Sequence, residues 1–126
     1  MKNSSIIRTS AGLLGLGLAA ALPLVALHAQ PDPGDQVKSI RGEVVDLMCY
    51  LDHGARGEKH RGCATTCIKN GGPVGLLSEG QLYLVIGEHK PMNAELAPKA
   101  AQIVTLKGKV VERNGMKMIE NAHLEE

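Results

Sequence analysis

The stretch IVTLKGKVVERNGMKMIENAHL, residues 103–124, gives the clearest indication of the fold. Its two halves are rich in branched apolar residues, and they flank Asn114 and Gly115. Asn-Gly is the pair that two-residue hairpin turns favour, because both positions take a positive φ. We therefore predict that residues 103–113 and 116–124 form an antiparallel pair of strands.

Three earlier segments also have the composition of strands, with branched apolar residues bounded by turn residues. Gly42 interrupts the first of them, where we expect a bulge or bend, and that strand would deliver Cys49 at its end. Residues 93–102 have alanine-rich helical character, which Pro98 limits to a helical turn or two. The three predicted strands are residues 40–48, 73–77 and 81–86, the last two joined by a turn at 78–80.

The predicted order is strand, cysteine-containing segment, strand, strand, short helical link, strand, strand. Five strands with a helical connection between the third and the fourth is the order of an OB-fold, a small Greek-key barrel. We therefore predict an all-β fold with minor helix, an OB-like barrel in which a Cys/His-containing loop and helix is inserted between strands 1 and 2. A small β-sandwich or meander with the same strands is the alternative.

The N-terminal residues predict export. Lys2 and Arg8 are followed by residues 11–27, which contain no charged residue, and this pattern is typical of a secretory signal peptide, here cleaved after Ala29. We expect a periplasmic or secreted location, with membrane contact only through an uncleaved signal segment. The predicted divisions are a signal peptide at 1–29, a linker at 30–36 and the barrel domain at 37–126.

Composition limits the classes of partner. Two of the 14 basic residues, Lys2 and Arg8, lie in the signal peptide, which leaves 12 against 13 acidic residues. This near-neutral balance gives no electrostatic reason to expect a polyanion. The chain has no Phe or Trp, so it also lacks the stacking platform of single-strand binding proteins. We expect a periplasmic or secreted protein partner and no nucleic acid.

The sequence HRGCATTC, residues 60–67, places His60, Cys63 and Cys67 within eight positions. If residues 61–68 are helical, side chains three or four positions apart lie on one face. Three metal-binding side chains would then converge. A domain of this size, with a core limited to aliphatic residues and methionine, often needs a metal or covalent staple.

A metal site is the leading hypothesis for this cluster. Tetrahedral Zn²⁺ takes four Cys or His ligands, and thiolate with imidazole also suits copper, especially Cu(I). The predicted ligands are Cys49, Cys63 and Cys67 with either His60 or His53 as the fourth. The protein would bind a copper or zinc ion for delivery, storage or sensing, and we do not expect enzymatic turnover.

Two aspartates bracket Cys49 in the sequence. Asp46 and Asp52 are predicted to hydrogen-bond a ligating histidine without binding the metal themselves. Their alternative role is ordinary strand-end and turn chemistry. His89 and His123 stand alone in the sequence, and we expect them to be surface histidines.

Two other hypotheses use the same cysteines. Exported proteins meet an oxidising environment, and a disulfide between Cys49 and either Cys63 or Cys67 would contribute on the order of 3 kcal/mol. The protein would then be a disulfide-stapled interaction module that binds a partner on its barrel face. The third hypothesis is a thiol redox protein, which requires a lowered thiol pKa.

The motif G-E-V-V-D-x-x-C-Y, residues 42–50, precedes H-x-x-C-A-x-x-C-I-x-x-G-x-P, residues 60–73. Together they resemble a group of small exported bacterial proteins of unknown function, over nearly the whole mature domain. The final G-K-V-V-E-R-N-G hairpin resembles OB-like barrels. This resemblance implies that the cysteines and histidines form one site. A weaker similarity to periplasmic copper-delivery proteins of the Sco type is limited to the C-x3-C spacing, because those proteins have a proline where Ile68 follows Cys67.

Overall fold

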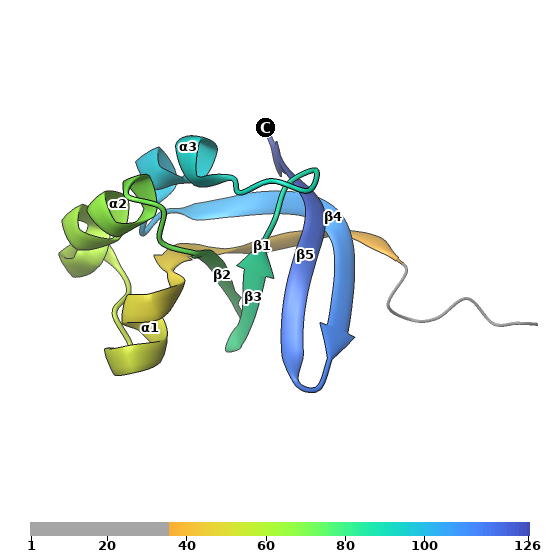
Figure 1. Cartoon of the computed structure of the whole chain (residues 1–126), viewed down its shortest axis with the longest axis horizontal. Coiled ribbons are helices and arrows are strands. Elements are labelled where there is room, and N and C mark those ends of the chain that lie inside the picture. The colour runs from red at the N-terminus through yellow and green to blue at the C-terminus, as the bar shows by residue number, and fades with distance from the viewer. Residues whose placement is uncertain (1–35) are drawn as a thin grey trace, which may run out of the picture.

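The computed structural model describes residues 36–126 (Figure 1). The predicted signal peptide and nearly all of the predicted linker lie outside the described residues. No helix among residues 36–126 has the length and apolar character needed to cross a membrane.

Five strands form a closed barrel in the order β1-β2-β3-β5-β4. Neighbouring strands are antiparallel except β3 and β5, which run parallel. This arrangement confirms the prediction of a small all-β, OB-like barrel with minor helix. The strands are β1 (Val37–Asp46), β2 (Val74–Ser78), β3 (Gln81–Val85), β4 (Ile103–Arg113) and β5 (Met116–Glu125).

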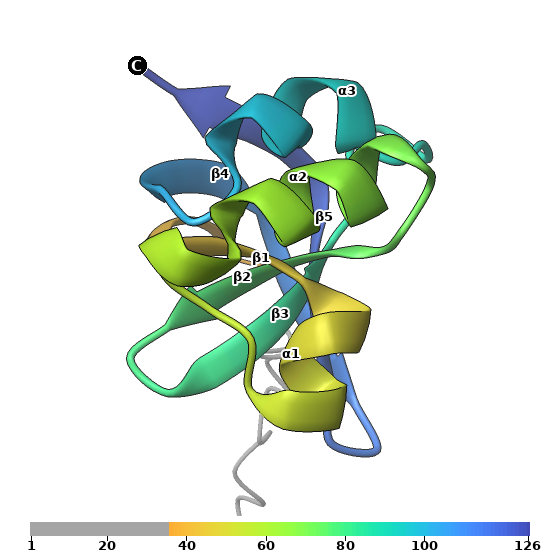
Figure 2. The same cartoon turned by 90° about the vertical axis from the view of Figure 1, so that its left-hand side faces the viewer.

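The helices lie at one side of the barrel, on the left in Figure 1 and facing the viewer in Figure 2. Three of them lie between β1 and β2, where a loop and one helix were predicted, and we call this part of the chain, residues 47–73, the insertion. The other two form the short link between β3 and β4. The helices of the insertion are α1 (Leu47–His53), the 3-10 turn η2 (Glu58–His60) and α2 (Arg61–Lys69), and those of the link are α3 (Asn93–Leu96) and η3 (Ala97–Lys99).

The hairpin turns as its sequence predicts. Asn114 and Gly115 have φ values of 52° and 82°, the positive values that a two-residue turn of this kind requires. The only register shift between β4 and β5 lies between Lys107 and Lys109. Gly108 lies at this shift, and its lack of a side chain lets β4 and β5 come close together, since a Cβ there would lie 2.6 Å from a methyl carbon of Ile119.

The sequence predicts a bulge or a bend at Gly42, which lies within β1. Residues 37–43 of β1 pair with β4, and residues 43–46 pair with β2. Gly42 therefore stands where β1 changes its partner. A Cβ at this position would lie 2.6 Å from the carbonyl oxygen of Leu77, so the absence of a side chain lets β2 cross closely over β1.

The core consists of aliphatic residues and methionine, as the composition requires. Ile68 of α2 and Leu96 of α3 are fully buried together with the barrel residues Leu76, Leu106 and Ile119. Because α2 and α3 contribute to the same apolar cluster as the strands, the helices are held against one end of the barrel by burial of apolar surface.

Candidate metal centre

Cys49 does not lie at a strand end, as the sequence suggested, but in the helix α1. Asp46, the last residue of β1, has an extended backbone, and its Oδ1 accepts a hydrogen bond of 2.8 Å from the amide of Cys49. This is an N-cap, which satisfies one of the free amides at the start of a helix. The apolar pair Leu47-Met48 looks like a continuation of the strand, and the capping by Asp46 explains why the strand stops before it.

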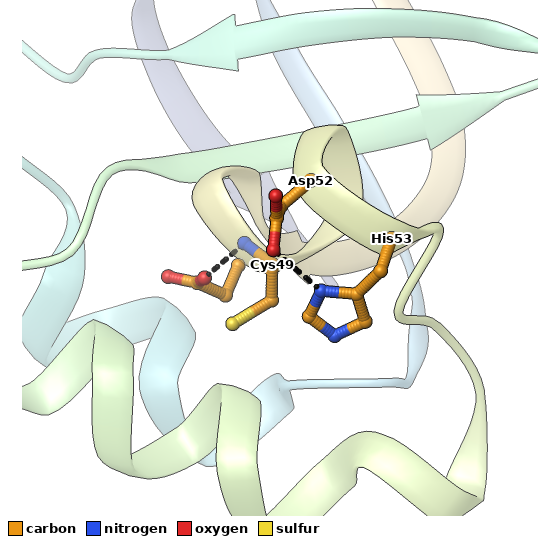
Figure 3. Close-up of polar contacts among 4 residues, drawn as sticks. Cys49, Asp52 and His53 are labelled. Atoms are coloured by element: carbon orange, nitrogen blue, oxygen red, sulfur yellow. Dashed lines mark hydrogen bonds and ion pairs between the residues drawn. The ribbon is translucent and has the colours of Figure 1, made fainter.

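One face of α1 carries Cys49 and His53, which are four positions apart. Figure 3 shows both side chains extending from α1 toward the same side, with the imidazole of His53 beside Cys49. The carboxylate of Asp52 contacts Nδ1 of His53 at 3.1 Å. Asp52 therefore contacts one of the histidines proposed as a ligand, at an exposed position.

The helix considered for residues 61–68 is confirmed as α2, which directly follows η2. Cys63 and Cys67 are four positions apart on α2, while Ala64 and Ile68 face the core. The apolar face of α2 packs against the barrel, and the two cysteines therefore lie at the boundary between the core and the solvent-exposed face of the helix. Cys63 is exposed and Cys67 is half-buried.

Two connections hold the insertion in place. In the loop between the helices, the amide of Gly57 donates a hydrogen bond to a carboxylate oxygen of Glu43 on β1. At the end of α2, the side-chain amide of Asn93 donates to the carbonyl oxygens of Ile68 and Gly72, both at 2.7 Å. These contacts tie α2 to the barrel and to α3, and so position its cysteines relative to α1.

The sulfur atoms of Cys49, Cys63 and Cys67 all lie within 4.8 Å of one another. A Zn–S distance of about 2.3 Å in a tetrahedral site implies sulfurs about 3.8 Å apart, so the cluster is close to the size that a metal requires. All three cysteines are free and no disulfide forms. The alternative disulfide of Cys49 with Cys63 or Cys67 is therefore absent from the structure.

The two histidines lie near each other but outside this group of three sulfurs. The ring centroids of His53 and His60 are 6.2 Å apart, and neither ring has a nitrogen within 4.8 Å of all three sulfurs. That one of them completes a Cys3His set stays a prediction.

Asp46 is the buried polar residue of the site. The residue is only 2% exposed. The second oxygen of its side chain, Oδ2, has no hydrogen-bond partner among the described residues. Gly72 lies against this oxygen, since a Cβ on Gly72 would be 2.7 Å from Oδ2 and 2.8 Å from the carbonyl oxygen of Cys67. The sequence singled out Asp46 as a partner for a histidine, whereas the structure places it beside Cys49.

The surroundings raise the pKa of two of the thiols, those of Cys49 and Cys67. The pKa of Cys49 is raised from 9.0 to about 12, first by its hydrogen-bonding contact with the Asp46 carboxyl, then by desolvation, and then by the negative charge of that carboxyl. Burial is the first cause that raises the pKa of Cys67, followed by hydrogen bonding with Cys63.

Two of the hollows formed by the described residues lie away from the cysteines. One, of about 500 Å³, lies between α1 and the barrel and is lined by apolar residues such as Leu51, Leu82 and Met116. The other, of about 440 Å³, is lined by both His89 and His123. These two histidines are exposed, as expected from the sequence, but they border the same hollow, which their separation of 34 positions in the chain did not indicate.

Comparisons with protein-family models, with curated proteins and with solved structures found no match. They therefore give no support to the group of exported bacterial proteins that the sequence motifs resemble. The closed five-stranded barrel is consistent with the OB-like part of that resemblance.

Proposed function

We propose that this chain is a small exported protein that binds one copper or zinc ion through Cys49, Cys63 and Cys67, for delivery, storage or sensing of the metal. The observation that carries the proposal is the grouping of three sulfurs within 4.8 Å of one another. They come from two separate helices, so their convergence results from the tertiary structure.

The location of the cluster supports exchange of a metal as well as binding. Cys49 and Cys67 are half-buried, whereas Cys63 is exposed. An ion held by two sheltered sulfurs and one accessible sulfur could be reached by the ligands of a partner. The N-terminal signal-peptide pattern favours exchange in the periplasm or outside the cell, and we propose a periplasmic or secreted protein as the partner.

The competing hypothesis of a thiol redox protein requires thiolates at neutral pH, because the thiolate is the nucleophile. The raised pKa values of Cys49 and Cys67 oppose this requirement. Metal binding is compatible with them, since a metal ion displaces the proton from a coordinating thiol.

The proposal is tested on protein purified without a polyhistidine tag. We expect one copper or zinc ion per chain by elemental analysis, and three free thiols, counted in denaturant, once the metal is removed by a chelator. Cys63→Ser removes one sulfur from the group and should weaken metal binding sharply.

Thr66→Ser is the matched control, because Thr66 is also exposed on α2 and its side chain bonds only the carbonyl oxygen of Gly62 in the same helix. This variant should bind metal as the unchanged protein does. Protein that contains no metal, takes up neither copper nor zinc, and shows one free thiol with a disulfide would instead support the stapled interaction module.

A further inference from the structure

The buried carboxyl of Asp46 is more than a helix cap requires. Oδ1 alone satisfies the amide of Cys49, and a serine or threonine hydroxyl would cap the helix in the same way. Asp46 instead buries a second oxygen, Oδ2, the one buried side-chain nitrogen or oxygen atom without a hydrogen-bond partner in the described part of the chain. Burying a carboxylate oxygen without a partner costs free energy, and a cation bound to Oδ2 would offset that cost.

The backbone makes room for this oxygen beside the cysteines. Gly72 follows the end of α2, and any side chain on it would collide with Oδ2 and with the carbonyl oxygen of Cys67. On its other side the carboxyl lies against Cys49, since its Oδ1 accepts a hydrogen bond of 2.8 Å from the amide of that residue. The carboxyl of Asp46 thus lies between the helices that supply the three sulfurs.

We propose that Oδ2 of Asp46 is the fourth ligand of the site and that it selects a divalent ion, zinc, over Cu(I). This inference rests on the proposed function. Carboxylate oxygen is an established Zn²⁺ ligand at about 2.0–2.2 Å, whereas Cu(I) is selected by soft sulfur ligands. An additional negative charge among three thiolates also favours an ion with two positive charges over an ion with one.

The ligand set would close by a small movement. Oδ2 does not lie within 4.8 Å of all three sulfurs. Cys63 is exposed on α2, so its side chain can change rotamer without repacking the core. His53 and His60 are the other candidates for the fourth position, and the experiment must separate them from Asp46.

The test compares Zn²⁺ and Cu(I) affinities of the full chain, measured by competition with a chromophoric chelator for each ion. Asp46→Asn keeps the shape and the helix cap but removes the charged oxygen. We expect it to weaken zinc binding by at least about 10-fold, the lower end of the effect known for groups beside a metal, and to leave Cu(I) binding unchanged. A double variant, His53→Gln with His60→Gln, should retain zinc binding.

Two further measurements guard against a purely structural effect. Asp46→Ser also caps the helix and should reproduce the loss of zinc, while Glu88→Gln removes an exposed carboxylate that lines a separate hollow and should change neither affinity. With Co²⁺ in place of zinc, Asp46→Asn should alter the ligand-field bands and preserve the sulfur-to-metal charge-transfer intensity of three thiolates.

The inference is overturned if Asp46→Asn and Asp46→Ser bind zinc as tightly as the unchanged protein, if both variants lose zinc and Cu(I) equally, or if the histidine double variant alone loses zinc. In each of these cases the unchanged protein still binds metal, so the proposed function stands. An unchanged protein that binds neither ion overturns the proposed function and this inference together.

Discussion

The structure of the β4–β5 hairpin depends on neighbouring residues, whereas the structure of the insertion between β1 and β2 depends on residues far away in the sequence. The hairpin is determined locally, because Asn114 and Gly115 adopt the positive φ values that the turn needs and the flanking strands pair beside it. The insertion depends on distant residues, since Asn93 fixes the end of α2 through bonds that span 25 and 21 positions. The candidate metal site therefore lies in the region whose structure depends on contacts between residues far apart in the sequence.

The first way to break this comparison is to remove packing from each region. Ile68 of the insertion and Ile119 of the barrel are both 0% exposed. Replacing a buried isoleucine by alanine costs about 2–5 kcal/mol, depending on how far the site collapses. We expect Ile68→Ala and Ile119→Ala to lower the free energy of unfolding of the metal-free protein within the same range, as measured by denaturant titration.

Leu51→Ala is the control for this pair, because Leu51 is 68% exposed and a surface substitution changes stability by about 0.5 kcal/mol or less. If Ile68→Ala left global unfolding unchanged, α2 would be a separable flap and not part of the core. The shared burial of Ile68 with strand residues is the reason to expect a single cooperative unit.

The second prediction concerns backbone conformation. Gly115 has a φ of 82° and open space around its Cα, so Gly115→Ala introduces strain without a collision. The left-handed conformation costs an alanine roughly 1–2 kcal/mol, and we expect a loss of stability of that size. The measurement is thermal or denaturant unfolding of the metal-free variant.

Gly62→Ala is the matched substitution in the insertion. Gly62 lies in α2, and nothing lies within 4 Å of a Cβ added there. Alanine is more stable than glycine in a helix by roughly 0.5–1 kcal/mol, so the same chemical change should stabilise the protein. Equal effects of the two substitutions would show that backbone conformation does not distinguish the regions.

Much of the fold could be predicted from the sequence because turns and periodicity are local. The hairpin, the five-strand order and the helix that carries Cys63 and Cys67 all follow from neighbouring residues, and the structure confirms them. The helix α1 was missed because its start depends on a side-chain bond from Asp46, while Leu47 and Met48 have the composition of a strand. The cap has a local signature, an aspartate three residues before the amide that it binds, which could have suggested a helix.

The sequence predicted that the three cysteines lie together, but it did not predict the geometry around them. The spacing of Cys63 and Cys67 on a helix indicated a shared face, and Cys49 was expected to approach from another segment. The orphaned oxygen of Asp46 and the space left by Gly72 could not be predicted, because they arise where the end of β1 meets the end of α2. Such contacts depend on how two distant segments pack.

The smallest perturbation that sharpens the comparison is the removal of one proton from Cys49. Its pKa of about 12 in the folded protein, against 9.0 as its ordinary value, means that the folded state holds the thiol proton more tightly than the unfolded chain. The resulting contribution to stability is fully present below pH 9 and is lost as pH rises from about 9 toward about 12. In metal-free protein, alkylation of Cys49 should accordingly be slow at neutral pH and should increase steeply only in that alkaline range.

Peptide mass spectrometry after alkylation at a series of pH values measures this rate for Cys49, and the same series in denaturant gives the reference profile. Partial burial alone would lower the rate at every pH, whereas a raised pKa moves the midpoint of the profile, so the midpoint is the quantity that decides. Asp46→Asn should move that midpoint back toward the reference, because it removes the group that is the first cause of the shift. A midpoint that is the same in the folded and denatured protein would contradict the contact between the carboxyl of Asp46 and the thiol of Cys49.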